Sequence, residues 1–443
     1  MDFKKLLVVP TAAALLATNA GLAQADTHQE EMMVTVDTEA AELRSTLDHL
    51  LSEHAFLAVE TMRKGADGAE DFEESAAALS ENTDELSSTI GSVYGEEAGQ
   101  QFKTMWSEHI GYFVDYVNAT AAGDEGAKET ALNELAQYRQ DFSQFLETAT
   151  DERLEAGALA DGLQMHVNQL IGAFDAYVMG DYETAYQYER EAIHHMYMVS
   201  KGLSTAIADQ FPDQFNNTDP ATKAADLRSD LNYLFSEHAG LAAMAMQNGI
   251  DGAEDFEASA QALSNNTQGL TEAVTGVYGE EAGQQFKAMW AEHIGYFVDY
   301  VNATAAEDTA AQEEALNNLN MYKEEFSKFM ETATEGNLAS DALAEGLEMH
   351  VNQLIGAFDA YSSGDYEVAY DQTREAYHHM FNPSKGLASA IVTQMPDMFM
   401  SEMPEEMPNT AMAPEQNNAL LISIIAGIAL LSAVLFRLRA RNQ

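Results

Sequence analysis

The stretch Glu108-His109-Ile110-Gly111-Tyr112-Phe113-Val114-Asp115-Tyr116-Val117-Asn118-Ala119-Thr120 recurs unchanged as Glu292–Thr304, 184 positions further along the chain. The same offset relates Val93–Lys103 to Val277–Lys287, and it carries all of Leu43–Phe215 onto Leu227–Phe399. A constant offset without gaps is typical of a tandem duplication. We therefore expect two copies of one domain, residues 40–215 and 224–399. Their joint, residues 216–223, has the Asn, Asp and Pro content of a linker.

Each copy carries apolar residues and histidines at helical spacing. Leu43, Leu47, Leu50, His54 and Leu57 step by 4, 3, 4 and 3 positions, which places them on one helix face. Similar stripes run through 102–116 and 159–177, and Gly/Asp turns follow at 65–68, 123–124 and 180–181. Alternating β-branched runs are missing. The pattern predicts an all-α protein of two tandem six-helix domains, each built from three helical hairpins of roughly 55 residues.

Composition excludes several classes of function. Of 443 residues, 73 are acidic and 21 basic, which gives a formal charge of −52. Nucleic-acid readers need clustered Lys and Arg, so nucleic acid is not an expected partner. A hydrophobic content of 46% separates the chain from disordered acidic tails. The absence of cysteine excludes disulfides, thiolate metal sites and cysteine nucleophiles.

The N-terminus has the three parts of a secretory signal peptide. Lys4 and Lys5 precede an apolar stretch from Leu6 to Ala17, and Ala23-Gln24-Ala25 forms an Ala-x-Ala site. We expect residues 1–25 to be a signal peptide and the mature chain to be exported; an uncleaved membrane anchor is the alternative.

The C-terminus predicts an anchor. An apolar run at 419–436 is just long enough to form a transmembrane helix, and the basic tail 437–443 would stay in the cytoplasm. The preceding Met/Pro-rich spacer, 400–418, contains Met407-Pro408-Asn409-Thr410-Ala411, which resembles the LPxTG/LPNTA class of sortase signals with Met in place of Leu. The order of pentapeptide, apolar run and basic tail is similar to that of sortase substrates. This resemblance implies cleavage at Thr410–Ala411 by a sortase and attachment to the cell wall of a Gram-positive bacterium; a retained plasma-membrane anchor with the body extracellular is the alternative.

Histidines on the core-facing stripes are the candidate metal ligands. Helical bundles build metal sites from inward His and Glu on facing helices, and imidazole suits copper, iron and zinc. Carboxylates next to the histidines, or four positions from them, are candidate partners. The candidates in the first copy are His54, His109, His166, His195, Glu53, Glu108 and Glu191, and those in the second are His238, His293, His350, His379, Glu237, Glu292 and Glu375. Trp106, Tyr112, Tyr116 and Tyr177 would line this site.

Two interpretations of these histidines stay open. They bind copper or another transition metal, or they are buried polar groups that hydrogen-bond across the core. The Glu-x-x-His pairing of di-iron carboxylate bundles is not reproduced on two facing helices. Glu53 and His54, like Glu108 and His109, are adjacent and point about 100° apart on a helix, and Glu191 and His194 are three positions apart on one helix only. His49 becomes Tyr233 in the second copy, so it cannot belong to a site that both copies share.

Spaced methionines between Met395 and Met412 could bind Cu(I), a soft ion. The simpler interpretation is a Pro-rich spacer in which methionine is tolerated.

The motifs of nucleophilic enzymes are missing from the sequence, which favours a non-catalytic role and excludes catalytic residues of that kind.

The Ser-Glu-His triplets and the Gly-Tyr-Phe-Val-Asp-Tyr block resemble secreted helical-repeat proteins of Bacillota described as copper-amine-oxidase-like. The quinone-forming Asn-Tyr-Asp/Glu motif of true copper amine oxidases is missing, since Asn232-Tyr233 is followed by Leu234. The expected function is therefore a surface metal-binding protein; a metal-dependent redox enzyme and a metal-free structural or adhesive module are the alternatives.

Overall fold

The computed structural model describes residues 34–400, and every regular element in this range is a helix. The predicted all-α class is thereby confirmed. None of the helices between residues 34 and 400 combines the length and the apolar character that crossing a membrane requires. The predicted signal peptide, sorting motif and transmembrane segment lie outside the described residues.

The first copy forms three helical hairpins in chain order, as the spacing predicts. They are α1 (Glu39–Asp67) with α2 (Phe72–Tyr94), α3 (Glu96–Ala122) with α4 (Glu125–Ala149), and α5 (Ala156–Val178) with α6 (Tyr182–Gln210). The Gly-Asp pair between α3 and α4 shows how a turn is specified. Gly123 ends α3 in the left-handed region with φ of 64°, and the Asp124 side chain accepts a hydrogen bond from the Ala127 N–H at the start of α4.

The second copy repeats this arrangement up to its last helix. It consists of α7 (Lys223–Asp251), α8 (Phe256–Tyr278), α9 (Glu280–Ala305), α10 (Thr309–Ala333), α11 (Ser340–Ser363), α12 (Tyr366–His379) and α13 (Phe381–Gln394). The short elements η1 (Pro212–Phe215) and α14 (Pro396–Phe399) follow α6 and α13.

The predicted single sixth helix is wrong for the second copy, where it divides into α12 and α13 at Met380. Pro383 supplies the reason. A proline has no N–H for the carbonyl four positions earlier, and its ring crowds that carbonyl. The equivalent position in the first copy is Val199, and α6 is continuous there.

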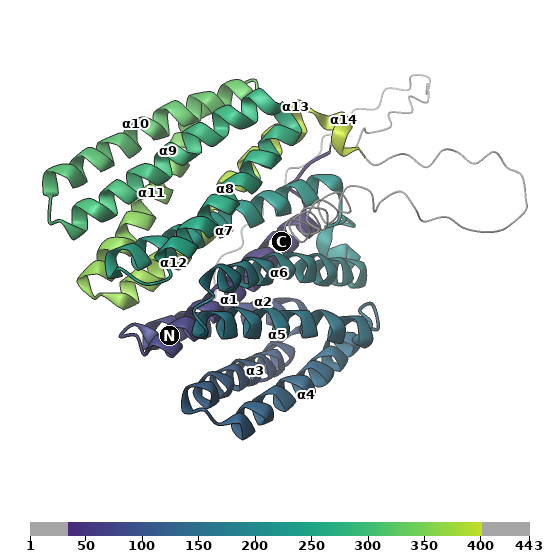
Figure 1. Ribbon diagram of the computed structural model, residues 1–443. Coiled ribbons are helices and arrows are strands. Elements are labelled where there is room, and N and C mark those ends of the chain that lie inside the picture. Colours follow the sequence, from purple (N-terminus) through teal and green to yellow (C-terminus); the bar gives the residue numbers. More distant parts are fainter. Residues whose placement is uncertain (1–33, 401–443) are drawn as a thin grey trace, which may run out of the picture. The chain divides into compact units, whose positions relative to one another are not determined.

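The two copies pack against each other within one compact unit. Helix α1 contacts α7, α6 contacts α8, and α12 contacts α2 (Figure 1). The ion pairs across this interface are reciprocal. Arg44 bonds Asp226 at 2.6 Å, and its equivalent Arg228 bonds Glu42, the equivalent of Asp226, at 2.8 Å. Such exchange of equivalent residues is the pattern of a two-fold interface, here within one chain.

A buried charge network at the interface breaks this symmetry. Arg63 bonds Asp255 and Lys64 bonds Asp71, each at 2.7 Å. The two aspartates are equivalent residues of the two copies. The two bases have no charged counterparts, because the second copy carries Gln247 and Asn248 at those positions. One copy therefore supplies the cations that neutralise acids from both.

Candidate metal centre

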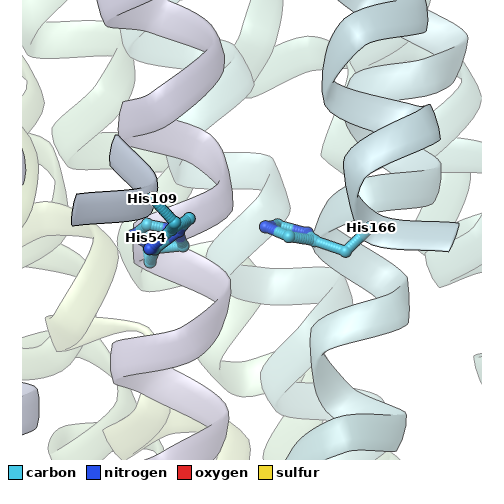
Figure 2. Close-up of side chains that lie close together, drawn as sticks. All are labelled: His54, His109 and His166. Atoms are coloured by element: carbon cyan, nitrogen blue, oxygen red, sulfur yellow. The ribbon is translucent and has the colours of Figure 1, made fainter. Parts of the chain in front are cut away.

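Three buried histidines meet inside the first copy. His54 lies on α1, His109 on α3 and His166 on α5, and their exposed fractions are 0%, 3% and 4%. The ring centroid of His54 lies 5.4 Å from that of His109 and 5.9 Å from that of His166. One ring nitrogen from each histidine lies within 4.8 Å of the other two. Figure 2 shows His166 pointing from α5 toward the pair formed by His54 and His109.

The ring nitrogens of this His54/His109/His166 cluster are poorly satisfied. Both nitrogens of His54, both of His166 and Nδ1 of His109 are buried without a hydrogen-bond partner. Leaving a buried polar atom unpaired costs about 1–3 kcal/mol, so a cluster of them is unfavourable unless something binds there.

Electrostatics keep these imidazoles neutral. Burial lowers the pKa of His109 and of His166 to about 3, and neighbouring imidazoles add to the effect at His166. Burial, together with the neighbouring imidazoles of His109 and His166, holds the pKa of His54 well below its ordinary value. Neutral imidazole is the form that binds metal ions.

Aromatic side chains enclose the cluster. Trp106 lies 4.7 Å from His54 and 4.7 Å from His109, measured between ring centroids. Tyr138 stacks on His109 at 4.9 Å. Tyr138 was not anticipated as a lining residue, although it shares a helical stripe with Leu135 and Phe142 that could have marked it.

The other tyrosines expected to line the site lie elsewhere. Tyr116 donates a hydrogen bond to Asp175, Tyr177 donates one to Asp67, and Tyr112 is partly exposed.

His238, His293 and His350 occupy the corresponding positions of the second copy, but among residues 34–400 only the first-copy cluster has its ligand nitrogens close enough together to hold a metal ion. Centroid distances from His238 are 5.3 Å to His293 and 5.8 Å to His350. Here the Nε2 atoms of His238 and His293 lie 3.4 Å apart, within hydrogen-bond reach of each other. Both nitrogens of His350 remain without a partner. Burial lowers the pKa of all three histidines, as in the first copy.

The fourth predicted histidine of each copy does not join these clusters. His195 Nε2 hydrogen-bonds the carbonyl oxygen of Gly162 at 3.0 Å, and His379 Nε2 bonds that of Gly346 at 2.8 Å. Each bond ties the last hairpin together, since the histidine and the glycine lie on its two helices.

The predicted carboxylates also lie away from the clusters. Glu53 and Glu237 are buried, but they bond arginines of the opposite copy, Arg374 and Arg190. Glu108, Glu191, Glu292 and Glu375 are exposed to solvent. The structure thus brings together histidines alone.

No family model, curated protein or solved structure matches the chain.

Proposed function

We propose that this protein is an exported, cell-surface protein that binds a transition metal, with copper as the leading candidate, through three inward histidines in each copy. The observation that carries the proposal is the His54/His109/His166 cluster, whose nitrogens converge and are left without hydrogen bonds. The N-terminal signal and the C-terminal sorting pattern support the surface location.

Three neutral imidazoles form a familiar ligand set for zinc, copper or iron, with a further coordination position left for water or another ligand. Three nitrogens at about 2.1 Å from one tetrahedral ion lie roughly 3.4 Å apart. The imidazoles of the first copy therefore need to close by about an ångström around an ion.

The test is elemental analysis of the full chain, expressed without a histidine tag, exposed to copper, zinc or iron and then dialysed. We expect metal at both clusters. His109→Leu with His166→Leu should remove the metal of the first copy and leave that of the second. His194→Leu is the matched control, because His194 lies outside both clusters. The proposal fails if the parent chain retains no metal, or if replacing both pairs, His109/His166 and His293/His350, leaves the metal content unchanged. The chain would then be treated as a structural surface module.

A further inference from the structure

The first copy contains an apolar cavity of about 260 Å³ that reaches the histidine cluster. Its walls include Leu51, Leu86, Phe102, Trp106 and Leu146, and His166 lies among them. Residues at its outer end, such as Glu155 and Met198, are exposed, and Met198 is 55% accessible. The cavity therefore connects the surface with the interior of the bundle.

The corresponding space in the second copy is almost filled, with about 30 Å³ remaining. The linings differ at several positions. Leu51 is replaced by the larger Phe235, Leu146 by Met330, which has a similar volume but a longer, unbranched side chain, and Val199 by Pro383, next to the division between α12 and α13. Phe235 and Met330 are both buried. The Phe235 ring lies 5.8 Å from that of Trp290, the equivalent of Trp106. Helices of near-identical sequence thus enclose a cavity in one copy and a packed core in the other.

Three side chains of the cavity wall have buried nitrogens without a hydrogen-bond partner: Trp106 at Nε1, His195 at Nδ1, and His166 at both ring nitrogens. His166 is 4% exposed and has the most unsatisfied atoms of the three. A ligand atom that donates or accepts a hydrogen bond would satisfy a group that is otherwise costly to bury. The lining contains no Lys or Arg, and Glu155 stands at its outer end. An anionic ligand would be desolvated there without compensation, so the lining favours an uncharged one.

We propose that the first copy binds an uncharged small molecule, with an apolar body and a single hydrogen-bonding atom directed at His166, and that the second copy excludes it. Apolar cavities of about 150 Å³ already bind benzene, so this cavity accepts a substituted aromatic ring or a molecule of similar size. Binding of such a molecule is separate from metal binding, because its contacts are the apolar wall and one imidazole of the chain.

The two tryptophans of the chain report on the two sites separately. Trp106 lines the open cavity and Trp290 the filled one. In the metal-free full chain, without detergent that would compete for the cavity, Trp290→Phe leaves Trp106 as the reporter and Trp106→Phe leaves Trp290. The probes are 4-bromophenol and bromobenzene, whose bromine quenches nearby tryptophan fluorescence.

We expect saturable quenching of Trp106 and only weak, linear quenching of Trp290. Bromophenol should bind Trp290→Phe at least threefold more tightly than bromobenzene, and His166→Leu should abolish that preference. Leu51→Phe with Leu146→Met, added to Trp290→Phe, should weaken binding at least tenfold.

The reverse exchange, Phe235→Leu with Met330→Leu, is the matched variant. Added to Trp106→Phe, it should make the quenching of Trp290 saturable. Circular dichroism and the thermal midpoint establish that each variant is folded. Equal quenching of both tryptophans, or unchanged affinity after the cavity is filled, would overturn the proposal. Since all measurements use metal-free protein, neither result bears on the metal site.

Discussion

Arg190 of the first copy forms a two-pronged salt bridge with Glu237 of the second, with Nε–Oε1 and Nη2–Oε2 distances of 3.0 Å each. Its equivalent in the second copy, Arg374, forms the same kind of bridge with Glu53 of the first copy. The Nε–Oε1 and Nη2–Oε2 distances there are 3.2 Å each. Each glutamate directly precedes the α1 or α7 histidine of a cluster. The helices that carry His54 and His238 are thus fixed by arginines from the other copy.

Removing Arg374 should destabilise the protein strongly. Glu53 is 1% exposed, and breaking a buried pair by deleting one partner costs about 3–5 kcal/mol. We expect Arg374→Met to lower the free energy of unfolding by that amount in urea titrations. Adding Glu53→Gln should recover a large part of the loss, because the orphaned charge is then removed. A loss below about 1 kcal/mol in the single variant would mean that water reaches Glu53.

Glu189 should make stability depend on pH. Burial raises its pKa from 4.5 to about 8; Arg63 acts in the opposite direction, and Glu60 and Glu237 add to the rise. The folded state therefore holds a proton that the unfolded chain releases, so stability falls as pH rises from about 4.5 to about 8.

Glu189→Gln should therefore resemble the parent chain near pH 4.5 and exceed its stability at pH 8. Urea titrations at both pH values measure this difference. Glu191→Gln, an exposed neighbour on α6, is the control and should show no such gain. An equal effect of Glu189→Gln at both pH values would show that its carboxyl is already ionised in the folded protein.

The His54/His109/His166 cluster should lower the free energy of unfolding of the metal-free protein. His166→Leu removes two buried nitrogens without partners, and we expect it to raise the free energy of unfolding by about 1–3 kcal/mol in the absence of metal. Bound metal should stabilise the first copy of the parent chain. In the His166→Leu variant, added metal should have no such stabilising effect. Thermal unfolding with and without copper measures both quantities. A less stable metal-free variant would show that His166 is a structural core residue.

Gly99 marks a close approach of α3 to α2. A Cβ there would lie 2.7 Å from the Ser87 carbonyl oxygen and 2.9 Å from the Gly91 Cα, both backbone atoms. Gly99→Ala should therefore destabilise the protein by about 1–3 kcal/mol.

Gly111 on the same helix has open space around it. Because alanine is a better helix former than glycine, Gly111→Ala should raise the free energy of unfolding by about 0.5–1 kcal/mol. Denaturant titrations of both variants give the comparison. A neutral Gly99→Ala would mean that α2 and α3 can separate at little cost.

Spacing alone predicted the helices and the convergence of His54, His109 and His166, because stripes at equivalent depth on neighbouring helices face one core. The division of the last helix at Met380 was also present in the sequence, as Pro383. The partners of Glu53 and Glu237 could not be predicted, since they depend on how one copy packs on the other. The cavity of the first copy was equally hidden. It depends on how residues far apart in sequence, such as Leu51 and Val199, together fill one space.

The reciprocal bridges have a consequence for how this gene can change. Long identical blocks, such as 93–103 and 277–287, are natural points for recombination that deletes one copy. A chain shortened in this way would keep a buried glutamate and an arginine that meet only across the interface. Two shortened chains would then have to associate to pair them, so deleting a copy would convert an internal contact into an intermolecular one. The second copy thus supplies, within one chain, the partner that a single copy would have to find in another molecule.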